Sequence, residues 1–166
     1  MTEQFTFFWN GPFSQWHPSV FIVSGLTEQF NQPQDKMKFT RAEQFMMYSK
    51  AMFFGDEITA AKIMKSNKPS EQKAYGRLVT PFDKVAWDTV ARPFVKMGSI
   101  AKFSQNPALM KKLLATAGTT LVEASPHDKI WGIGLRAKDP RALNRETWLG
   151  TNWLGEVLTE VRDEFL

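Results

Sequence analysis

The sequence predicts a mainly α protein with a small β-sheet, folded as a single domain over residues 1–166. Apolar residues recur at helical spacing in five or six segments, whereas only two or three short runs are rich in aromatic and β-branched residues. These runs do not alternate with helices as they do in βαβ units, so a doubly wound sheet is not expected. No Pro/Gly-rich linker divides the chain, which is long enough to bury one core.

Two strands are expected near the N-terminus, at residues 4–9 and 19–24, where aromatic and β-branched residues cluster. Asn10-Gly11-Pro12 ends the first run. Residues 27–36 are polar and are expected to form a loop. A third β-prone run, residues 119–123, leads into a segment rich in glycine and aromatic side chains.

Six segments have helical spacing. Thr40-Arg41-Ala42-Glu43 matches a capping box and marks the start of the first helix. Pro93 lies inside the fourth segment, where it predicts a kink or a break. Residues 136–150 are expected to be a loop. The expected helices cover residues 41–54, 56–65, 69–78, 83–104, 107–116 and 152–165.

Composition and charge exclude several classes of site. The net charge of +4 suits an anionic small ligand or a nucleic acid, but is mild enough to indicate neither. The chain has no cysteine, so disulfides and thiolate metal sites are excluded. Its only histidines are His17 and His127, and no H-E-x-x-H occurs, so no metal site is expected.

Other patterns argue against a cofactor and a membrane. Gly132-Ile133-Gly134 is a G-x-G without a following helix, so it is a weak dinucleotide fingerprint, and no cofactor is expected. No basic-then-apolar segment opens the sequence, and no apolar run is long enough to span a bilayer. We therefore expect a cytoplasmic protein without a membrane or an obligate protein partner.

Two carboxylates stand out. On a helical period Glu43, Met47 and Lys50 share one face. Glu43 and Lys50 are about 10 Å apart along the axis, which suits two ends of one extended ligand. From the pattern alone, a structural role for Glu43 in the capping box is the simpler interpretation. Asp128 precedes Trp131, and its simplest role is to cap a turn.

The six tryptophans could serve in the core or as surfaces for stacking. Trp87 has helical spacing, and both it and Trp131 would ordinarily be core residues. Aromatic rings also serve as platforms on which nucleobases stack, at about 1–3 kcal/mol per base. The sequence leaves both roles open.

Seven pieces of the sequence together match a known family pattern. They are F-S-Q-W (13–16), A-E-Q-F-M-M-Y-S-K-A (42–51), G-R (76–77), Trp87, K-F-S-Q-N-P-A-L (102–109), L-V-E-A-S-P-H-D-K-I-W-G-I-G-L (121–135) and G-T-N-W-L-G-E-V-L-T-E-V-R (150–162). In this order they run over nearly the whole chain. The chain thus resembles the YbiA-like family, also called the NADAR family.

The resemblance implies a mainly helical YbiA-like domain with N-glycosidase activity. Family members resemble enzymes that cut the bond between ribose C1 and a nitrogen. Some hydrolyse phosphoribosyl-amine intermediates of riboflavin synthesis, and others look like enzymes that remove ADP-ribose from guanine in nucleic acid. The implied partner is therefore a nucleotide-type small molecule or an ADP-ribosylated nucleic acid.

The resemblance also implies roles for individual residues. Glu43 and Asp128 would be the catalytic carboxylates, in either order as acid and base. The implied substrate-binding residues are Ser14, Lys50, Arg77, Trp87, Trp131, Gly132 and Asn152, among which Lys50 and Arg77 would hold phosphate and the tryptophans would wall the base or sugar. For Asn152 an N-cap role is the alternative. Two alternatives to an enzyme remain: a non-catalytic module that binds ADP-ribose or NAD, and a structural or interaction protein.

Overall fold

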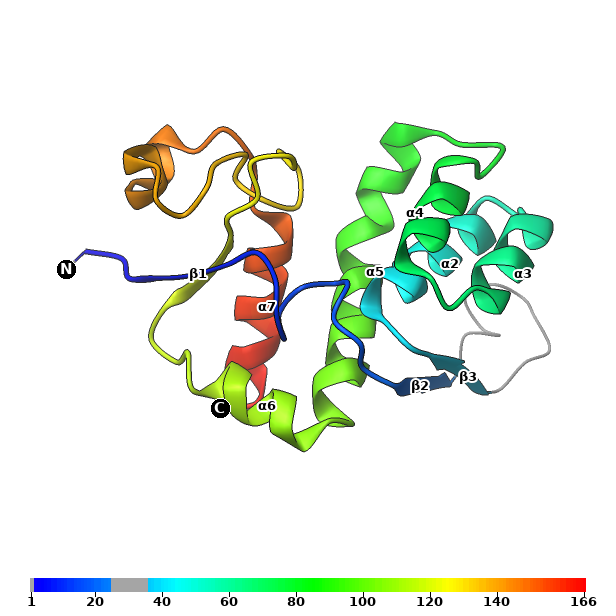
Figure 1. Cartoon of the computed structure of the whole chain (residues 1–166), viewed down its shortest axis with the longest axis horizontal. Coiled ribbons are helices and arrows are strands. Elements are labelled where there is room, and N and C mark those ends of the chain that lie inside the picture. Colours follow the sequence, from blue (N-terminus) through cyan, green and yellow to red (C-terminus); the bar gives the residue numbers. More distant parts are fainter. Residues whose placement is uncertain (1, 25–35) are drawn as a thin grey trace. The chain divides into compact units, whose positions relative to one another are not determined.

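The computed structural model describes residues 2–24 and 36–166 and confirms the mainly helical fold (Figure 1). The chain divides into two compact units. Unit 1 consists of Met1–Ser14 with Pro107–Leu166, and unit 2 of Gln15–Asn106. The expectation that residues 1–166 form one domain stays a prediction. In the described ranges no helix is long and apolar enough to cross a membrane.

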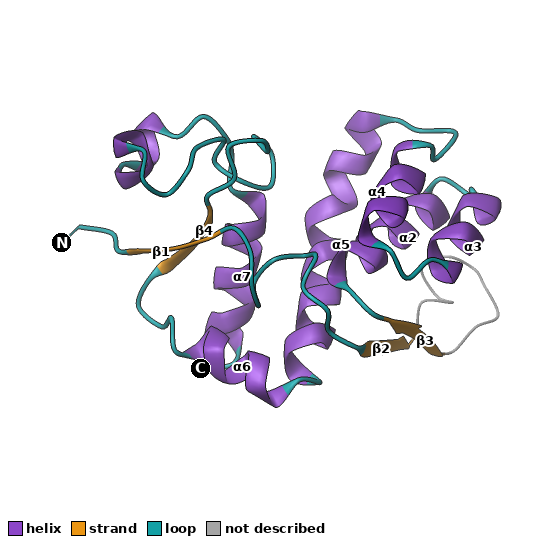
Figure 2. Ribbon diagram, viewed as in Figure 1, coloured by secondary structure: helices purple, strands orange, loops and turns teal. Residues whose placement is uncertain are grey.

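Unit 1 is built on a short parallel strand pair (Figure 2). β1 (Phe5–Phe8) pairs with β4 (Thr120–Glu123), so that Phe8 lies opposite Glu123. α6 (Pro107–Leu114) precedes β4 in the chain. The loop expected at 136–150 contains two 3-10 turns, and the last helix follows it: η1 (Pro140–Leu143), η2 (Arg145–Thr147) and α7 (Trp153–Glu164).

α7 packs closely on β4. A Cβ atom at Gly155 would collide with the carbonyl oxygen of Leu121, so the helix and the strand approach at a distance that only glycine allows. The Leu121 N–H donates a hydrogen bond of 2.9 Å to Thr159 Oγ1. A core cluster supports the segment that follows β4, with Val122, Ile133, Leu135 and Ala142 buried against Phe5, Phe7 and Trp148. This packing fixes the strand from which the Asp128 loop departs.

Unit 2 is a helical cluster with an antiparallel strand pair. β2 (Phe21–Ser24) pairs with β3 (Lys36–Phe39). Phe21 and Phe39 are cross-strand partners whose rings stack at 5.7 Å, and both rings contact Phe45. The helices are α2 (Ala42–Phe53), α3 (Glu57–Lys65), α4 (Pro69–Arg77) and α5 (Lys84–Ser104). The described strands thus form two pairs, whereas the sequence led us to expect a single small sheet.

Four local expectations need correction or comment. α5 runs without a break through Pro93, because Ala91, Phe94 and Val95 are buried on the flanking turns. Burying such side chains offsets the roughly 3 kcal/mol that an internal proline costs. The sequence did not predict β3, where lysines alternate with apolar residues. Most of the loop expected at 27–36 lies outside the described residues.

The capping box is the fourth. α2 begins at Ala42, with Arg41 as an N-cap that makes no side-chain cap bond. The Gln44 side-chain oxygen accepts the Thr40 N–H at 2.9 Å, so Gln44 takes the reciprocal role that the sequence assigned to Glu43. The pattern was therefore wrong by one residue about which side chain bonds back to the Thr40 N–H.

Candidate active site

In unit 1 a closed loop follows β4 and holds Asp128. Asp128 Oδ1 accepts the backbone N–H groups of Ile130 at 2.9 Å and Trp131 at 2.8 Å. The Gly134 N–H donates to the Asp128 carbonyl oxygen at 3.0 Å, and Gly134 adopts a positive φ of 71° that favours glycine. The turn-capping role of Asp128 is present in the structure.

Only one oxygen of the Asp128 carboxylate, Oδ1, caps the turn. Oδ2 accepts no hydrogen bond within the part of the chain that the structure describes. The side chain is half-buried. Asp128 thus presents a rigidly held carboxylate oxygen, which is what charge stabilisation at a sugar carbon requires.

Gly132 is buried inside this loop. A Cβ atom there would lie 2.9 Å from the Glu123 carbonyl oxygen, 3.0 Å from that of Asp128 and 3.1 Å from Glu123 Oε2. The glycine is thus required for the loop to close on itself, and its predicted contact with a ligand stays a prediction. The same geometry shows a carboxylate that sequence reasoning missed: Glu123 lies against the Asp128 loop at the end of β4.

Asn152 is fully buried and joins three segments of unit 1. Its Oδ1 accepts the Glu123 N–H at 2.9 Å, its Nδ2 donates to the Leu121 carbonyl at 3.0 Å, and its own N–H donates to the Gly132 carbonyl at 3.0 Å. It makes no N-cap bond to α7 and has a positive φ of 53°. The amide therefore positions β4 and the Asp128 loop, while a ligand contact from Asn152 remains a prediction.

Replacing Asn152 should destabilise the protein more than replacing a residue on its surface would. In Asn152→Ala the Glu123 N–H and the Leu121 carbonyl lose their partners in a buried place, each at about 1–3 kcal/mol. We expect the free energy of unfolding in urea to fall by about 2–4 kcal/mol. Asn152→Gly is the control, since glycine tolerates the positive φ and removes only the side-chain bonds. Wild-type stability in both variants would contradict this role.

The other candidates of unit 1 lie near the loop or on a separate segment. Trp131 is half-buried, and its ring meets Trp153 edge-on at 5.5 Å. Trp131 is also tied to Asp128 through its backbone N–H. Ser14 is buried on the turn after β1, where its N–H donates to the Gly11 carbonyl. Unit 1 thus brings Asp128, Trp131, Gly132 and Asn152 together.

In unit 2 the first turn of α2 holds Glu43. Its backbone N–H donates to the Gln15 carbonyl at 2.9 Å, and the residue is only 7% exposed. Burial lowers the pKa of Lys50, two turns further along α2. The charge of Glu43 opposes this shift, whereas that of Arg77 adds to it, so both groups lie close enough to act on Lys50. The Lys50 Nζ also lies 4.6 Å from the centre of the Phe82 ring.

The position of Arg77 follows from how α4 packs. A Cβ atom at Gly76 would collide with the sulfur of Met47, so α4 approaches α2 at the face that carries Glu43. Arg77, the next residue, is the last of α4 and is exposed. Unit 2 therefore groups one buried carboxylate with two cations, an arrangement suited to a ligand that carries both a sugar and a phosphate.

Trp87 lies within an aromatic cluster of unit 2. Its ring stacks on Phe94 at 6.1 Å with an interplanar angle of 17°, and its centre is 6.3 Å from that of Phe53. It is 7% exposed. Trp87 thus belongs to the core of unit 2. Its contact with the base or sugar of a ligand stays a prediction.

Comparison with known proteins decides the family. The model of the NADAR domain matches residues 7–166. The chain belongs to the NADAR family. "N-glycosidase R617" of Acanthamoeba polyphaga mimivirus is 43% identical over 152 residues, which cover 92% of this chain and 86% of that protein. The resemblance predicted from the sequence is confirmed.

Two further relatives extend this result. The NMR structure of the E. coli protein YbiA matches with a TM-score of 0.75 and 26% identity, covering 99% of this chain and 86% of that one. The curated E. coli protein is named "N-glycosidase YbiA" and is 31% identical over 70% of this chain and 66% of its own length. "Riboflavin biosynthesis protein PYRR, chloroplastic" of Arabidopsis thaliana is 34% identical over 63% of this chain but only 16% of that protein. The names of R617 and YbiA bear out the prediction that this NADAR protein is an N-glycosyl hydrolase.

One buried cation of the NADAR chain was not singled out from its sequence. Lys102 on α5 is 1% exposed, and burial lowers its pKa to about 7. Its Nζ lies 5.0 Å from the centre of the Phe103 ring. Lysine in a helix is usually solvated, so only the tertiary structure identifies this one.

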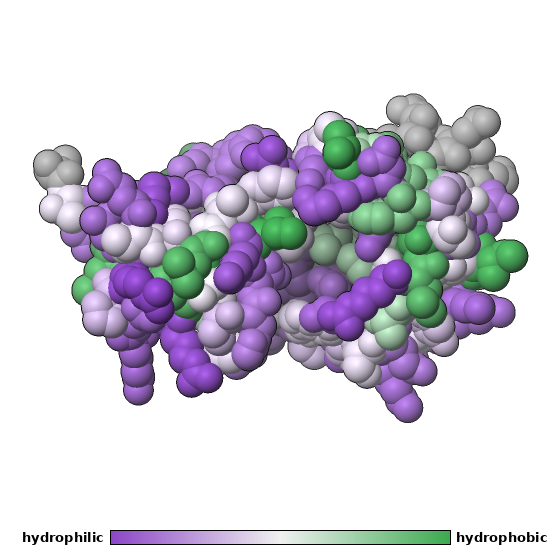
Figure 3. Space-filling view, turned by 90° about the horizontal axis from the view of Figure 1, so that it is seen from above, coloured by the Kyte–Doolittle hydropathy of each residue, from purple (hydrophilic) through white to green (hydrophobic). Residues whose placement is uncertain are grey.

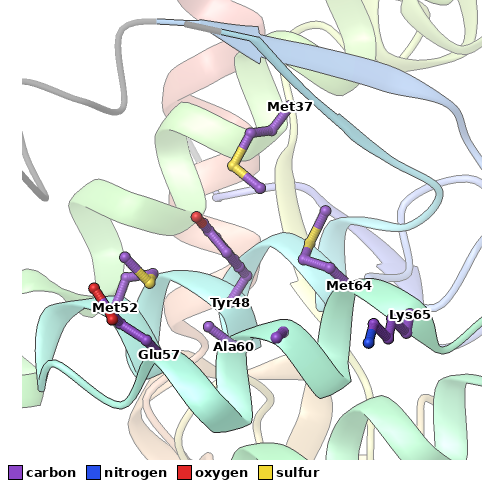
Figure 4. Close-up of a pocket in the computed structure, with 8 residues that line it drawn as sticks. Met37, Tyr48, Met52, Glu57, Ala60, Met64 and Lys65 are labelled. Carbon is purple, nitrogen blue, oxygen red and sulfur yellow. The ribbon is translucent and has the colours of Figure 1, made fainter. Parts of the chain in front are cut away.

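A pocket of about 410 Å³ lies between β3, α2 and α3 (Figure 4). Met37, Tyr48 and Met64 point toward one another there, with Glu57 and Lys65 along α3. Tyr48 lies five residues after Glu43, about 140° around α2. This pocket is therefore on a different face of the helix from the predicted site. No group of three or more His, Asp or Glu side chains suited to a metal ion occurs in the described ranges.

Proposed function

We propose that this NADAR protein hydrolyses the ribose C1–N bond of an ADP-ribosylated guanine in nucleic acid or of a phosphoribosylamino-pyrimidine intermediate of riboflavin synthesis. The observation that carries the proposal is the Asp128 carboxylate, fixed through Oδ1 by two backbone N–H groups with Oδ2 left available. The N-glycosidase names of R617 and YbiA support the reaction class. The PYRR name supports a riboflavin intermediate as one of the two substrates.

The proposed chemistry requires two proton carriers and one anionic neighbour for the sugar. The C1–N bond breaks with its electron pair moving to nitrogen, and positive charge builds on C1 and the ring oxygen. A carboxylate beside the ring stabilises that charge, and water adds to C1 after losing a proton to a base. A proton delivered to the departing nitrogen completes the reaction. We assign these duties to Asp128 and Glu43.

The remaining residues are proposed to hold the substrate. The cations Lys50 and Arg77 would bind its phosphate, as their clustering with Glu43 supports. Trp131 would stack on the base or sugar, held in place by the bond between its N–H and Asp128. Such a substrate is consistent with a cytoplasmic protein that needs no further cofactor.

A base-release assay tests this proposal. Purified protein is given ADP-ribosyl-guanine DNA and, separately, a phosphoribosylamino-pyrimidine, and mass spectrometry follows the products. We expect release of one base with formation of a free ribose C1 hydroxyl. Release from DNA alone identifies a hydrolase of modified nucleic acid, and release from the pyrimidine alone a metabolite hydrolase. Tight ADP-ribose binding with neither base released would instead support a non-catalytic binding module.

A further inference from the structure

Beside the Asp128 loop lies a second pocket, of about 390 Å³, which none of the predicted roles uses. Pro126 and Gly134, from the two ends of that loop, form one side of it. Its remaining polar lining comes from the segment that follows the loop, namely Arg136, Lys138, Asp139 and Arg141. All of these residues belong to unit 1.

The charge of this pocket is positive. Three cations face one carboxylate, and that carboxylate is already engaged. Asp139 accepts the Nε of Arg141 at 3.1 Å and its Nη2 at 2.8 Å, while its Oδ1 also accepts the Arg141 backbone N–H. This pairing lowers the pKa of Asp139 to about 2 and fixes the guanidinium plane, while Nη1 of Arg141 takes no part in it.

The other two cations of the pocket are not neutralised. Arg136 and Lys138 are exposed, and within residues 2–24 and 36–166 neither forms an ion pair. An arginine held in plane beside a second arginine and a lysine matches the donors that proteins use for phosphate. Figure 3 shows one face of the molecule, on which hydrophilic residues are widespread and hydrophobic groups lie between them.

The pocket adjoins the loop that carries the candidate catalytic Asp128. The Gly134 N–H bonds to the Asp128 carbonyl at 3.0 Å, and Arg136 is two residues further along the chain. Two residues span at most about 7 Å. The Arg136 backbone therefore lies within about 10 Å of the Asp128 carbonyl oxygen, so a phosphate in the pocket would bind beside the loop that carries the Asp128 carboxylate.

We propose that this pocket, formed by Arg136, Lys138 and Arg141, binds a phosphate group of the substrate other than the one assigned to Lys50 and Arg77, an inference that rests on the proposed function. The phosphate has two sources, a phosphodiester of the strand next to the modified base or the pyrophosphate of a free nucleotide. In both cases the pocket contributes to affinity, and the carboxylates carry the chemistry.

The test uses binding, so that it does not depend on turnover. The double variant Arg136→Ala/Lys138→Ala is compared with the wild type and with Lys111→Ala/Lys112→Ala. The control removes two exposed lysines from α6 in the same unit and changes the net charge equally. Fluorescence anisotropy of a short labelled single-stranded DNA is measured over a range of salt concentrations, and calorimetry measures ADP-ribose binding. Thermal unfolding verifies that all three proteins are folded.

If the phosphate is a phosphodiester, the Arg136/Lys138 variant should bind DNA about tenfold more weakly. The slope of log K for DNA binding against log salt concentration should also become less steep by about 1. If the phosphate belongs to a free nucleotide, the same variant should lose ADP-ribose binding and keep that of DNA. The proposal is overturned if the variant keeps wild-type affinity for both probes, or if the α6 control loses as much. A protein that binds through this pocket but releases no base would refute the proposed function and leave this inference standing.

Discussion

Glu43→Gln is expected to lower kcat for base release by about 10²–10⁴-fold while leaving the fold intact. Glutamine keeps the size and polarity of the side chain but cannot carry a proton between water and the departing nitrogen. The residue is nearly buried in the first turn of α2, so an isosteric change is needed to avoid a cavity. Single-turnover assays by mass spectrometry measure the rate, and urea unfolding measures the stability.

Glu57→Gln is the matched control for this variant. Glu57 occupies the first turn of α3 in the same unit, and its replacement removes the same charge from the first turn of a helix. If both variants lose activity equally, the effect is one of net charge. If Glu43→Gln turns over at the wild-type rate, Glu43 is a structural residue and the catalytic assignment is wrong.

The helices were predicted well because the patterns that define a helix lie within a few neighbouring residues. The capping-box pattern and Gly55 predicted a helix over 41–54, within one residue of α2 at each end, and Gly55 follows it with a positive φ. β3 was missed because its Lys36 and Lys38 alternate with only two apolar residues. That strand is stabilised by pairing with β2 and by burial of Phe39, which no short window of sequence reveals.

The capping box shows why a motif does not assign a role. The pattern pairs an N-cap with the third helical residue, which made Glu43 the partner of Thr40. The helix begins one residue later than the pattern indicates, and Gln44 therefore reaches back instead. Glu43 and Gln44 are both suited to this bond, and the sequence pattern alone does not distinguish them.

Long-range contacts explain what else the sequence left open. Asn152 was read as an N-cap or a ligand contact, yet its amide bonds to β4 some thirty residues earlier in the chain. Its positive φ and complete burial have no signature in the residues around it. The family pattern thus supplied the candidate residues, whereas the positioning role of Asn152 became visible only in the fold.

Asp128→Asn separates the two roles that the structure gives this carboxylate. Asparagine keeps an Oδ1 that accepts the Ile130 and Trp131 N–H groups, so the loop should retain its shape. It removes the negative charge that we propose stabilises the positive sugar. We expect kcat for base release to fall by about 10²–10³-fold, the loss typical of one electrostatic stabiliser, with little change in unfolding free energy.

Asp128→Ala removes the charge and the turn together, which makes it the companion measurement. It leaves two backbone N–H groups without their acceptor, so we expect an added loss of about 1–2 kcal/mol in unfolding free energy. If only the alanine variant loses activity, Asp128 acts by shaping the loop and the turn-capping role is its whole function. If both variants lose activity equally while Asp128→Asn keeps the wild-type free energy of unfolding, the function of the loop is to hold a charged oxygen in place. That outcome would explain why an aspartate, rather than an asparagine with the same turn-forming capacity, occupies this position.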